Sequence, residues 1–379
     1  MRNNRTSTAL VKHARKLHSG RALRVVALAA TAVLAFGSAG MGAGASRLTG
    51  NLVTVDLDEV ITHERPPQYA APAILSLADV IQERHAAFTT TTAANTPVNI
   101  LIMGTDDRSG DNGELAGRDS GGARSDSTII LHISGNREWA AAVSIPRDTI
   151  VNIPSCPTSS GRYTAARPTT RFNAAFAYGA LAGKDVASGA LCTLTTVEAI
   201  TNIRLDGFVV LDFAGFKNMV DALGGVELDI PRRIRSPLAG DLKLEPGLQV
   251  LDGWHALQYS RARTGVGLGG GSDLERIKRQ QTVIAAIANQ VMATNLLTNS
   301  AQLFRFLDAT TSYMTTSANY ATINGLAELA VALSSVDPAE IDFIMAPVRS
   351  NPLNPNTVLF ASAAKDLWAA LRFDNRPAL

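Results

Sequence analysis

The sequence predicts an α/β fold: an α–β–α sandwich with a central mixed β-sheet, preceded by one N-terminal transmembrane helix. Three observations support this prediction. From about residue 98 onward, short apolar runs of strand length alternate with segments of helical spacing. Of the 379 residues, 46% are hydrophobic, which is enough to form a core and argues against a disordered chain. Residues 25–45 carry no charged side chain.

The uncharged segment 25–45 contains 21 residues, enough to span a bilayer as a helix. Seven lysines and arginines lie in the basic tail 1–24, one follows the segment before residue 50, and residues 1–50 contain no Asp or Glu. The positive-inside rule therefore predicts a single-pass protein with a cytoplasmic tail and its remaining residues outside the cell membrane. The small residues 43–45 also resemble a signal-peptide cleavage site, so a cleaved signal peptide is the alternative. Both alternatives predict export.

The charge of the remaining chain excludes one class of partner. Residues 51–379 contain 27 basic and 33 acidic side chains, so this part of the protein is mildly acidic. A nucleic-acid-binding protein carries its positive field on the folded domain. The sequence therefore predicts no nucleic-acid partner.

The predicted strands and helices place a stalk before one folded domain. Residues 46–96, with a Pro-Pro step and a short helix predicted at 74–88, are typical of an extracytoplasmic stalk. One domain is predicted over 97–379, including C-terminal elements at 293–379. Apolar runs and turn residues predict strands at 98–104, 127–133, 139–145, 207–213, 226–231 and 340–348. Helical spacing predicts helices at 171–181, 194–203, 214–225, 272–294, 324–334 and 357–373.

A glycine-rich loop at 265–270 matches the dinucleotide fingerprint G-x-G-x-x-G. The fingerprint should follow a buried strand and precede an acidic residue by about 20 positions. Here a polar, basic segment precedes the loop, and no acidic residue lies near position 290. The match is therefore rejected as a nucleotide site.

Four arginines and Lys278 crowd into 19 residues around this loop, in a chain that is only 18% charged. Ser272 and Glu275 have capping-box spacing, which would begin a helix at Ser272. Isolated arginines are usually solvated surface residues, but guanidinium groups gathered at a helix N-terminus suit an oligophosphate. Arg261 and Arg263 would point the same way if their segment is extended. The four arginines are Arg261, Arg263, Arg276 and Arg279.

Carboxylates lie beside predicted strand ends, where open α/β sheets place ligands. Asp106 follows the first strand, Asp126 begins the second, and Arg147 follows the third. If the first two strands are antiparallel, Asp106 and Asp126 can meet and hold Mg²⁺ or Mn²⁺. A solvated loop is the alternative for Asp106. The six histidines show no ligand spacing, and His132 is expected to be a core residue.

Together these segments resemble the LytR–CpsA–Psr family of cell-envelope glycopolymer transferases. They occur in the family's order and lie between about 98 and 287. They are NILIMGTDDR (99–108), RSDSTIILHI (124–133), VSIPRDTIVNIP (143–154), RFNAAFAYG (171–179), GFVVLDFAGFKNMVDALGGVELDIP (207–231), LDGWHALQYSRAR (251–263) and SDLERIKRQQTVI (272–284).

The resemblance implies an α–β–α catalytic domain that transfers a polyprenyl-pyrophosphate-linked glycopolymer to a muramic-acid hydroxyl of peptidoglycan. It implies a metal site at Asp106 and Asp126. It also implies a pyrophosphate grip by Arg147, Arg261, Arg263 and Arg276, with support from Arg124, Asp273, Arg279 and Gln280. Asp126 or Asp273 is the hypothetical general base, and the glycine-rich segment is expected to be a mobile lid. A pyrophosphatase side activity fits the same site.

Several alternatives stay open at this level. The resemblance implies a tunnel for the lipid tail, to which Phe172, Phe176, Phe208 and Phe213 could contribute, although each could be an ordinary core residue. Cys156 and Cys192 could form a disulfide or remain buried thiols. The polymer could be arabinogalactan, teichoic acid or capsule. A non-catalytic, membrane-anchored protein that binds or senses polyprenyl phosphates is the alternative function, since it would need the arginines but not the two aspartates.

Overall fold

The structure is a computed structural model that describes residues 50–68, 96–105, 125–269, 273–293, 300–322 and 335–378, with parts of 323–334. The predicted tail and membrane helix, the predicted helix at 74–88, and the residues Asp106, Arg124 and Ser272 lie outside these ranges. Within the described ranges, no helix has both the length and the apolar character needed to cross a membrane.

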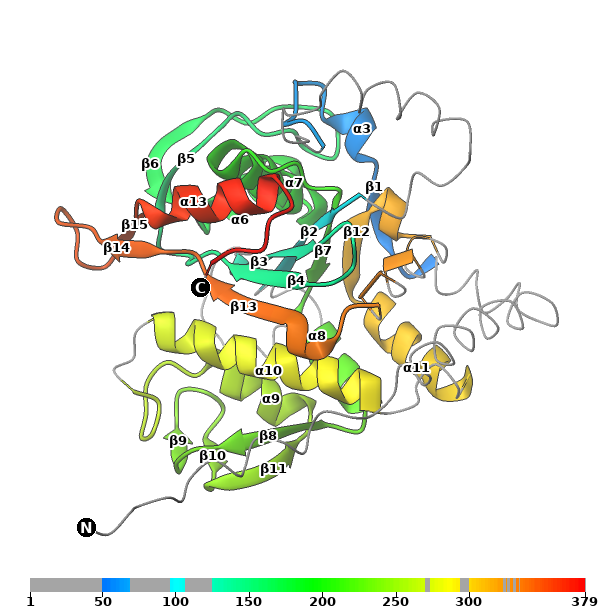
Figure 1. The fold of residues 1–379 in the computed structure, drawn as a ribbon, viewed down its shortest axis with the longest axis vertical. Helices are drawn as coiled ribbons and strands as arrows, with labels where there is room; N and C mark the ends of the chain where they lie inside the picture. The colour runs from blue at the N-terminus through cyan, green and yellow to red at the C-terminus, as the bar shows by residue number, and fades with distance from the viewer. Residues whose placement is uncertain are drawn as a thin grey trace, which may run out of the picture.

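The centre of the protein is one mixed sheet of seven strands, which confirms the predicted α/β fold with a central mixed sheet (Figure 1). Antiparallel pairing joins β2 to β3, β3 to β4 and β7 to β12, whereas β2–β7, β4–β13 and β1–β12 are parallel. In spatial order the strands are β1 (Val53–Val55), β12 (Met314–Ser317), β7 (Gly207–Leu211), β2 (Val98–Thr105), β3 (Ser125–Ile133), β4 (Ala140–Ser144) and β13 (Ile341–Met345).

Helices cover both faces of the sheet (Figure 1). On one face lie α6 (Ala174–Gly183), α7 (Val186–Thr201) and α13 (Ala363–Arg372). On the other lie α8 (Phe213–Ala222), α9 (Gly253–Arg261), α10 (Asp273–Ala293) and α11 (Ser300–Thr311). Because side chains alternate along a strand, Leu101 and Met103 of β2 enter the α6–α7 core, while Ile102 between them faces the opposite layer.

A second core lies below the α8–α10 layer. It joins these helices to two short ribbons, which are β8 (Val226–Ile230) with β11 (Gly247–Leu251) and β9 (Ile234–Ser236) with β10 (Leu242–Leu244). Two further pairs lie beside the sheet: β5 (Ile150–Ile153) with β6 (Arg167–Arg171), and β14 (Val348–Ser350) with β15 (Val358–Phe360). The two main cores are separate clusters, and this separation leaves room for the cavity described below.

The predicted stalk is wrong for its first part. Residues 53–55 form β1, which adds to the sheet by pairing with β12, and α3 (Leu57–Val60) places Leu57 and Val60 in the main core. Arg65 then forms a buried ion pair with Glu198 of α7, at 2.7 Å. This segment is therefore an integral part of the folded domain.

The last helix begins later than predicted. Residues 358–360 form β15 and pair with β14, so α13 starts only at Ala363. Three apolar residues do not reveal by periodicity whether they belong to a strand or to the following helix. The predicted helix ending at 373 is otherwise present, with Leu367, Trp368 and Leu371 buried.

The fold shows the partners of the two cysteines and of His132. The structure joins Cys156, between β5 and β6, to Cys192 of α7 by a disulfide. His132 is fully buried: its Nδ1 lies 2.7 Å from Asn99 Oδ1 and its Nε2 lies 3.0 Å from Asp374 Oδ1. The interpretation of His132 as a satisfied core residue is confirmed.

Candidate functional site

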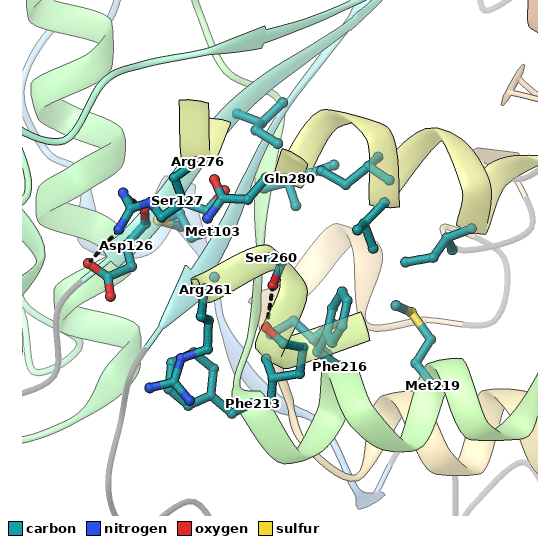
Figure 2. Close-up of a pocket in the computed structure, with 18 of the residues that line it drawn as sticks. Met103, Asp126, Ser127, Phe213, Phe216, Met219, Ser260, Arg261, Arg276 and Gln280 are labelled. Carbon is teal, nitrogen blue, oxygen red and sulfur yellow. Dashed lines mark hydrogen bonds and ion pairs between the residues drawn. The ribbon is translucent and has the colours of Figure 1, made fainter. Parts of the chain in front are cut away.

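An elongated cavity of about 910 Å³ lies between the sheet and the α8–α10 layer. Its sheet side is formed by apolar residues such as Ile102, Ile129 and Val209, which point away from the α6–α7 core. Figure 2 shows Phe216 and Met219 along the cavity, with Asp126 and Arg276 at one end. The cavity is therefore apolar along most of its length and charged at one end.

The charged end forms where β3 begins and β4 has just ended. Ile129 of β3 pairs with Ser144 of β4 in an antiparallel register, so Asp126 and Arg147, each three residues farther along, come together at the same edge. Arg147 Nη1 donates to Asp126 Oδ1 at 2.5 Å. Strand β2 also ends at this edge, because Thr105 pairs with Ser125.

Two more arginines converge on Asp126 from the helical layer. Arg276, in the first turn of α10, is only 2% exposed, and its Nη2 donates to the main-chain carbonyl of Asp126 at 3.1 Å. Its Nη1 lies 3.9 Å from Asp126 Oδ1, and Arg263 Nη2 lies 3.8 Å from the same oxygen. Burial alone would raise the pKa of Asp126, but Arg276, Arg147 and Arg263 outweigh it and hold that pKa below its ordinary value.

Arg261 and Arg263 reach the cavity by a route that the sequence did not predict. The segment is not extended, because α9 continues through Arg261. The backbone leaves the helix at Ala262, with φ −57° and ψ 130°, and this turn lets both arginines line the cavity. The Arg261 guanidinium lies over the ring of Phe213, 4.0 Å from its centre (Figure 2). A cation–π contact of this kind fixes the orientation of the side chain.

The glycine-rich segment is pinned rather than mobile in its described part, 264–269. Val266 and Arg235 of β9 exchange two backbone hydrogen bonds, of 2.9 and 3.1 Å, and Leu268 is buried in the second core. Gly265 and Gly267 have φ of 141° and 78°, and a Cβ on either would collide with a carbonyl oxygen of the β8–β9 segment. The glycines therefore serve close backbone approach, and the expected lid is wrong for these residues.

Arg279 contributes to this pinning. Its guanidinium donates to the carbonyls of Leu268 and Ala262, and the residue is 8% exposed. It does not line the cavity. The structure thus gives Arg279 a supporting role, in which it holds the backbone of the loop that carries Arg263.

The other expected residues divide into three groups. Gln280 lines the cavity one turn after Arg276, and Phe213 lines it as well. Phe172, Phe176 and Phe208 instead belong to the main core on the far face of the sheet. Asp106 and Arg124 lie outside the described residues, and of Asp273 only the backbone, at the start of α10, is described.

Sequence reasoning missed several residues that form the cavity. Phe216 and Met219 of α8 line it together with Phe213. Their spacing of three places them on one helix face, and this pattern could have identified them. Trp254 and Gln258 of α9 also line the cavity, but nothing in their local sequence distinguishes them from core residues.

Several known proteins have sequences similar to this chain. LcpA of Corynebacterium glutamicum, a cell wall biosynthesis protein, is 32% identical over 234 residues, which cover 58% of this chain and 44% of LcpA. The polyisoprenyl-teichoic acid–peptidoglycan teichoic acid transferase TagU of Oceanobacillus iheyensis is 31% identical over 210 residues, 55% of this chain and 56% of TagU. The chain thus spans about half the length of these curated relatives.

The fold is also found in solved structures. The LytR-Csp2A-Psr enzyme from Actinomyces oris superimposes with a TM-score of 0.54 at 19% identity, over 81% of this chain and 96% of that protein. A sequence profile described as the LytR_cpsA_psr family matches residues 73–372, well beyond the 98–287 recognised by its motifs. The chain therefore belongs to the LytR–CpsA–Psr family.

Proposed function

We propose that the protein is a phosphotransferase that attaches a polyprenyl-pyrophosphate-linked glycopolymer to peptidoglycan. The observation that carries this proposal is the shape of the cavity: a long apolar space that ends at converging arginines. An amphiphile with an apolar tail and a multiply charged head matches both parts. The name of the relative TagU, a transferase from a polyisoprenyl-linked polymer to peptidoglycan, supports the same activity.

The apolar part of the cavity would hold the polyprenyl tail. Transfer of hydrocarbon out of water contributes about 0.8 kcal/mol per buried CH₂ group. Several isoprene units buried between β7, α8 and α10 would therefore supply strong binding away from the reacting phosphate. Such remote binding can position the diphosphate at the cavity's charged end.

The arginines would bind the diphosphate and stabilise the charge that develops on the leaving polyprenyl phosphate. Guanidinium groups bind phosphate oxygens through paired hydrogen bonds. Arg276 and Arg261 are held in place by protein contacts before substrate arrives. Donors that are already oriented toward developing charge are among the largest contributors to catalysis. The reaction would form a bond from the acceptor hydroxyl oxygen to the glycan-linked phosphorus and break the bond from that phosphorus to the bridging oxygen. The products would be polyprenyl monophosphate and the glycan phosphate joined to peptidoglycan, and the hydroxyl proton would pass to solvent.

A divalent cation, Mg²⁺ or Mn²⁺, is part of the proposal. The described residues contain no cluster of three metal-ligating side chains, so the fit depends on a single carboxylate, Asp126, joined by substrate oxygens. The ionised state of Asp126 favours this fit. Thr105 pairs with Ser125, so β2 ends at the same edge as Asp126, whereas Asp106, the second ligand expected from the sequence, lies outside the described residues. Bound at this edge, the cation would supply charge neutralisation at the diphosphate.

We further propose that the domain works outside the cytoplasm, attached to the cell membrane. The Cys156–Cys192 disulfide supports this location, because disulfides persist in oxidising compartments and are rare in the cytosol. Residues 1–49, which carry the predicted membrane helix, lie outside the described part of the chain.

Metal dependence separates this enzyme from a non-catalytic polyprenyl-phosphate-binding protein. With a polyprenyl-pyrophosphate glycan and soluble peptidoglycan, we expect release of polyprenyl monophosphate that falls about 10²-fold when EDTA is added and returns with Mg²⁺. Asp126→Asn should require a higher Mg²⁺ concentration, whereas Asp229→Asn, on the exposed face of β8, should not. Full activity in EDTA would remove the cation from the proposal. Tight donor binding with no release would favour the non-catalytic alternative.

A further inference from the structure

The geometry of phosphoryl transfer restricts where the acceptor can bind. The attacking and leaving oxygens lie roughly in line on opposite sides of the phosphorus. In the proposed reaction the leaving oxygen belongs to the polyprenyl phosphate, whose tail would fill the apolar cavity. The acceptor must therefore approach the charged end from the side that faces away from the cavity.

A chain of charged side chains leads away from the cavity on that side. Arg147, which touches Asp126, does not line the elongated cavity, and its Nε lies 3.5 Å from Asp148 Oδ2. Asp148 Oδ1 in turn lies 3.3 Å from Nη1 of Arg171. Arg171 is the last residue of β6, and its side chain is 46% exposed. The chain of contacts thus runs from the candidate site to an exposed strand.

Strand β6 presents a second oriented cation. Arg167, its first residue, is exposed, and its guanidinium lies over the ring of Tyr178 of α6, 5.0 Å from the centre. Among the described residues no carboxylate pairs with Arg167. The ring contact restricts a side chain that would otherwise sample many rotamers, so less entropy is lost when Arg167 binds an anion.

The backbone of β6 is irregular between these two arginines. Thr169 has φ of 49°, which is rare for a β-branched residue, and its N–H donates to Asn152 Oδ1 at 2.9 Å. Ile150 pairs with Arg171 and Ile153 with Arg167, so β6 contains one more residue than β5 over this stretch. Such bulges re-aim side chains and are common beside functional sites.

We propose that β6 is the acceptor-binding strand: Arg167 and Arg171 bind carboxylates on the peptide branches of the peptidoglycan and so present a sugar hydroxyl to the phosphorus. This inference rests on the proposed function. The charge is complementary, because the strand carries two guanidinium groups and the peptide branches carry carboxylates. The surface is also continuous with the candidate site through Asp148 and Arg147.

The test compares two variants with two acceptors. Arg167→Ala is the main variant, because among the described residues Arg167 forms no ion pair with Asp148, which contacts Arg147. Arg349→Ala is its matched control. Arg349 is an exposed arginine on β14. Strand β14 pairs with β15, which contacts β5, so β15 and β5 separate β14 from β6. The acceptors are a soluble peptidoglycan fragment with free carboxylates and the same fragment with those carboxylates converted to amides. Three quantities are measured: KM for acceptor, KM for donor, and donor hydrolysis without acceptor.

For the free-carboxylate acceptor, Arg167→Ala should raise KM about two- to fivefold, the range expected for one exposed ion pair. For the amidated acceptor, the wild type and Arg167→Ala should have the same KM. Donor KM and hydrolysis without acceptor should be unchanged, and Arg349→Ala should match the wild type throughout. The double variant Arg167→Ala/Arg171→Ala should raise the acceptor KM further.

Three results would overturn the assignment. An unchanged acceptor KM in the double variant would remove β6 from acceptor binding. A raised donor KM with an unchanged acceptor KM would assign the strand to the donor's polymer. An equal loss with both acceptors would indicate a structural effect rather than carboxylate binding. If the wild type neither transfers nor hydrolyses the donor, the proposed function itself fails, and that result differs from all three.

Discussion

Replacing Arg276 with alanine should lower the rate of glycopolymer transfer by about 10²-fold or more, the cost of removing one preorganised electrostatic group. Arg276 is nearly fully buried, lines the cavity, and holds the main chain of Asp126 while facing its carboxylate. Its loss would remove a phosphate ligand and also loosen the edge of β3. The measurement is initial-rate release of polyprenyl monophosphate at saturating donor, with donor KM measured alongside.

Arg279→Ala is the informative comparison, since Arg279 lies one turn farther along α10. Its hydrogen bonds go to the carbonyls of Leu268 and Ala262, so its removal should lower thermal stability and loosen the loop that carries Arg263. Arg276→Ala should instead lose activity at a temperature where circular dichroism shows a folded protein. If Arg276→Ala retains wild-type transfer, the diphosphate does not bind at this arginine cluster.

Filling the cavity should weaken binding of long-tailed donors by about 10²-fold. Ala142 of β4 lines the cavity, whereas its neighbours Ala141 and Val143 face the main core. In Ala142→Phe, the phenyl ring would occupy space otherwise taken by about four carbons of the tail. At about 0.8 kcal/mol per CH₂ group, this exclusion costs about 3 kcal/mol of binding.

A donor with a shortened tail provides the control for Ala142→Phe. If the short tail does not reach the filled part of the cavity, the variant and the wild type should transfer from this donor at similar rates. The ratio of KM values for long and short donors is therefore the quantity to compare. A variant whose KM rises equally for both donors has disturbed the sheet. A variant whose KM rises for neither donor shows that the tail binds elsewhere.

The sequence predicted most of the residues that form the charged end of the site. Asp126 and Arg147 flank two neighbouring apolar runs, and antiparallel pairing of these runs is enough to bring them together, as the register shows. The family motifs then pointed to Arg263 and Arg276, which come from separate segments of the helical layer. Strand ends are predictable in this way because a short, nearly continuous apolar run marks each of these central strands locally.

Long-range pairing and steric requirements of the backbone were not predictable. Residues 53–55 look like part of a stalk, because their strand character arises from pairing with β12, about 260 residues later. The glycines at 265 and 267 suggested mobility, whereas they are required where the loop passes close to the β8–β9 carbonyls. A glycine that gives flexibility and a glycine that allows close backbone approach look the same in the sequence, and only the packed neighbours distinguish them.

The central claim is that the arginine–carboxylate end of the cavity moves the glycan-linked phosphate onto peptidoglycan while the lipid-linked phosphate stays with the tail. The direct measurement uses a donor labelled with ³²P only at the glycan-linked phosphorus. We expect the label in the peptidoglycan product and unlabelled polyprenyl monophosphate as the second product. Label that remains on the lipid, or that leaves as inorganic phosphate without entering peptidoglycan even when acceptor is saturating, would contradict the account.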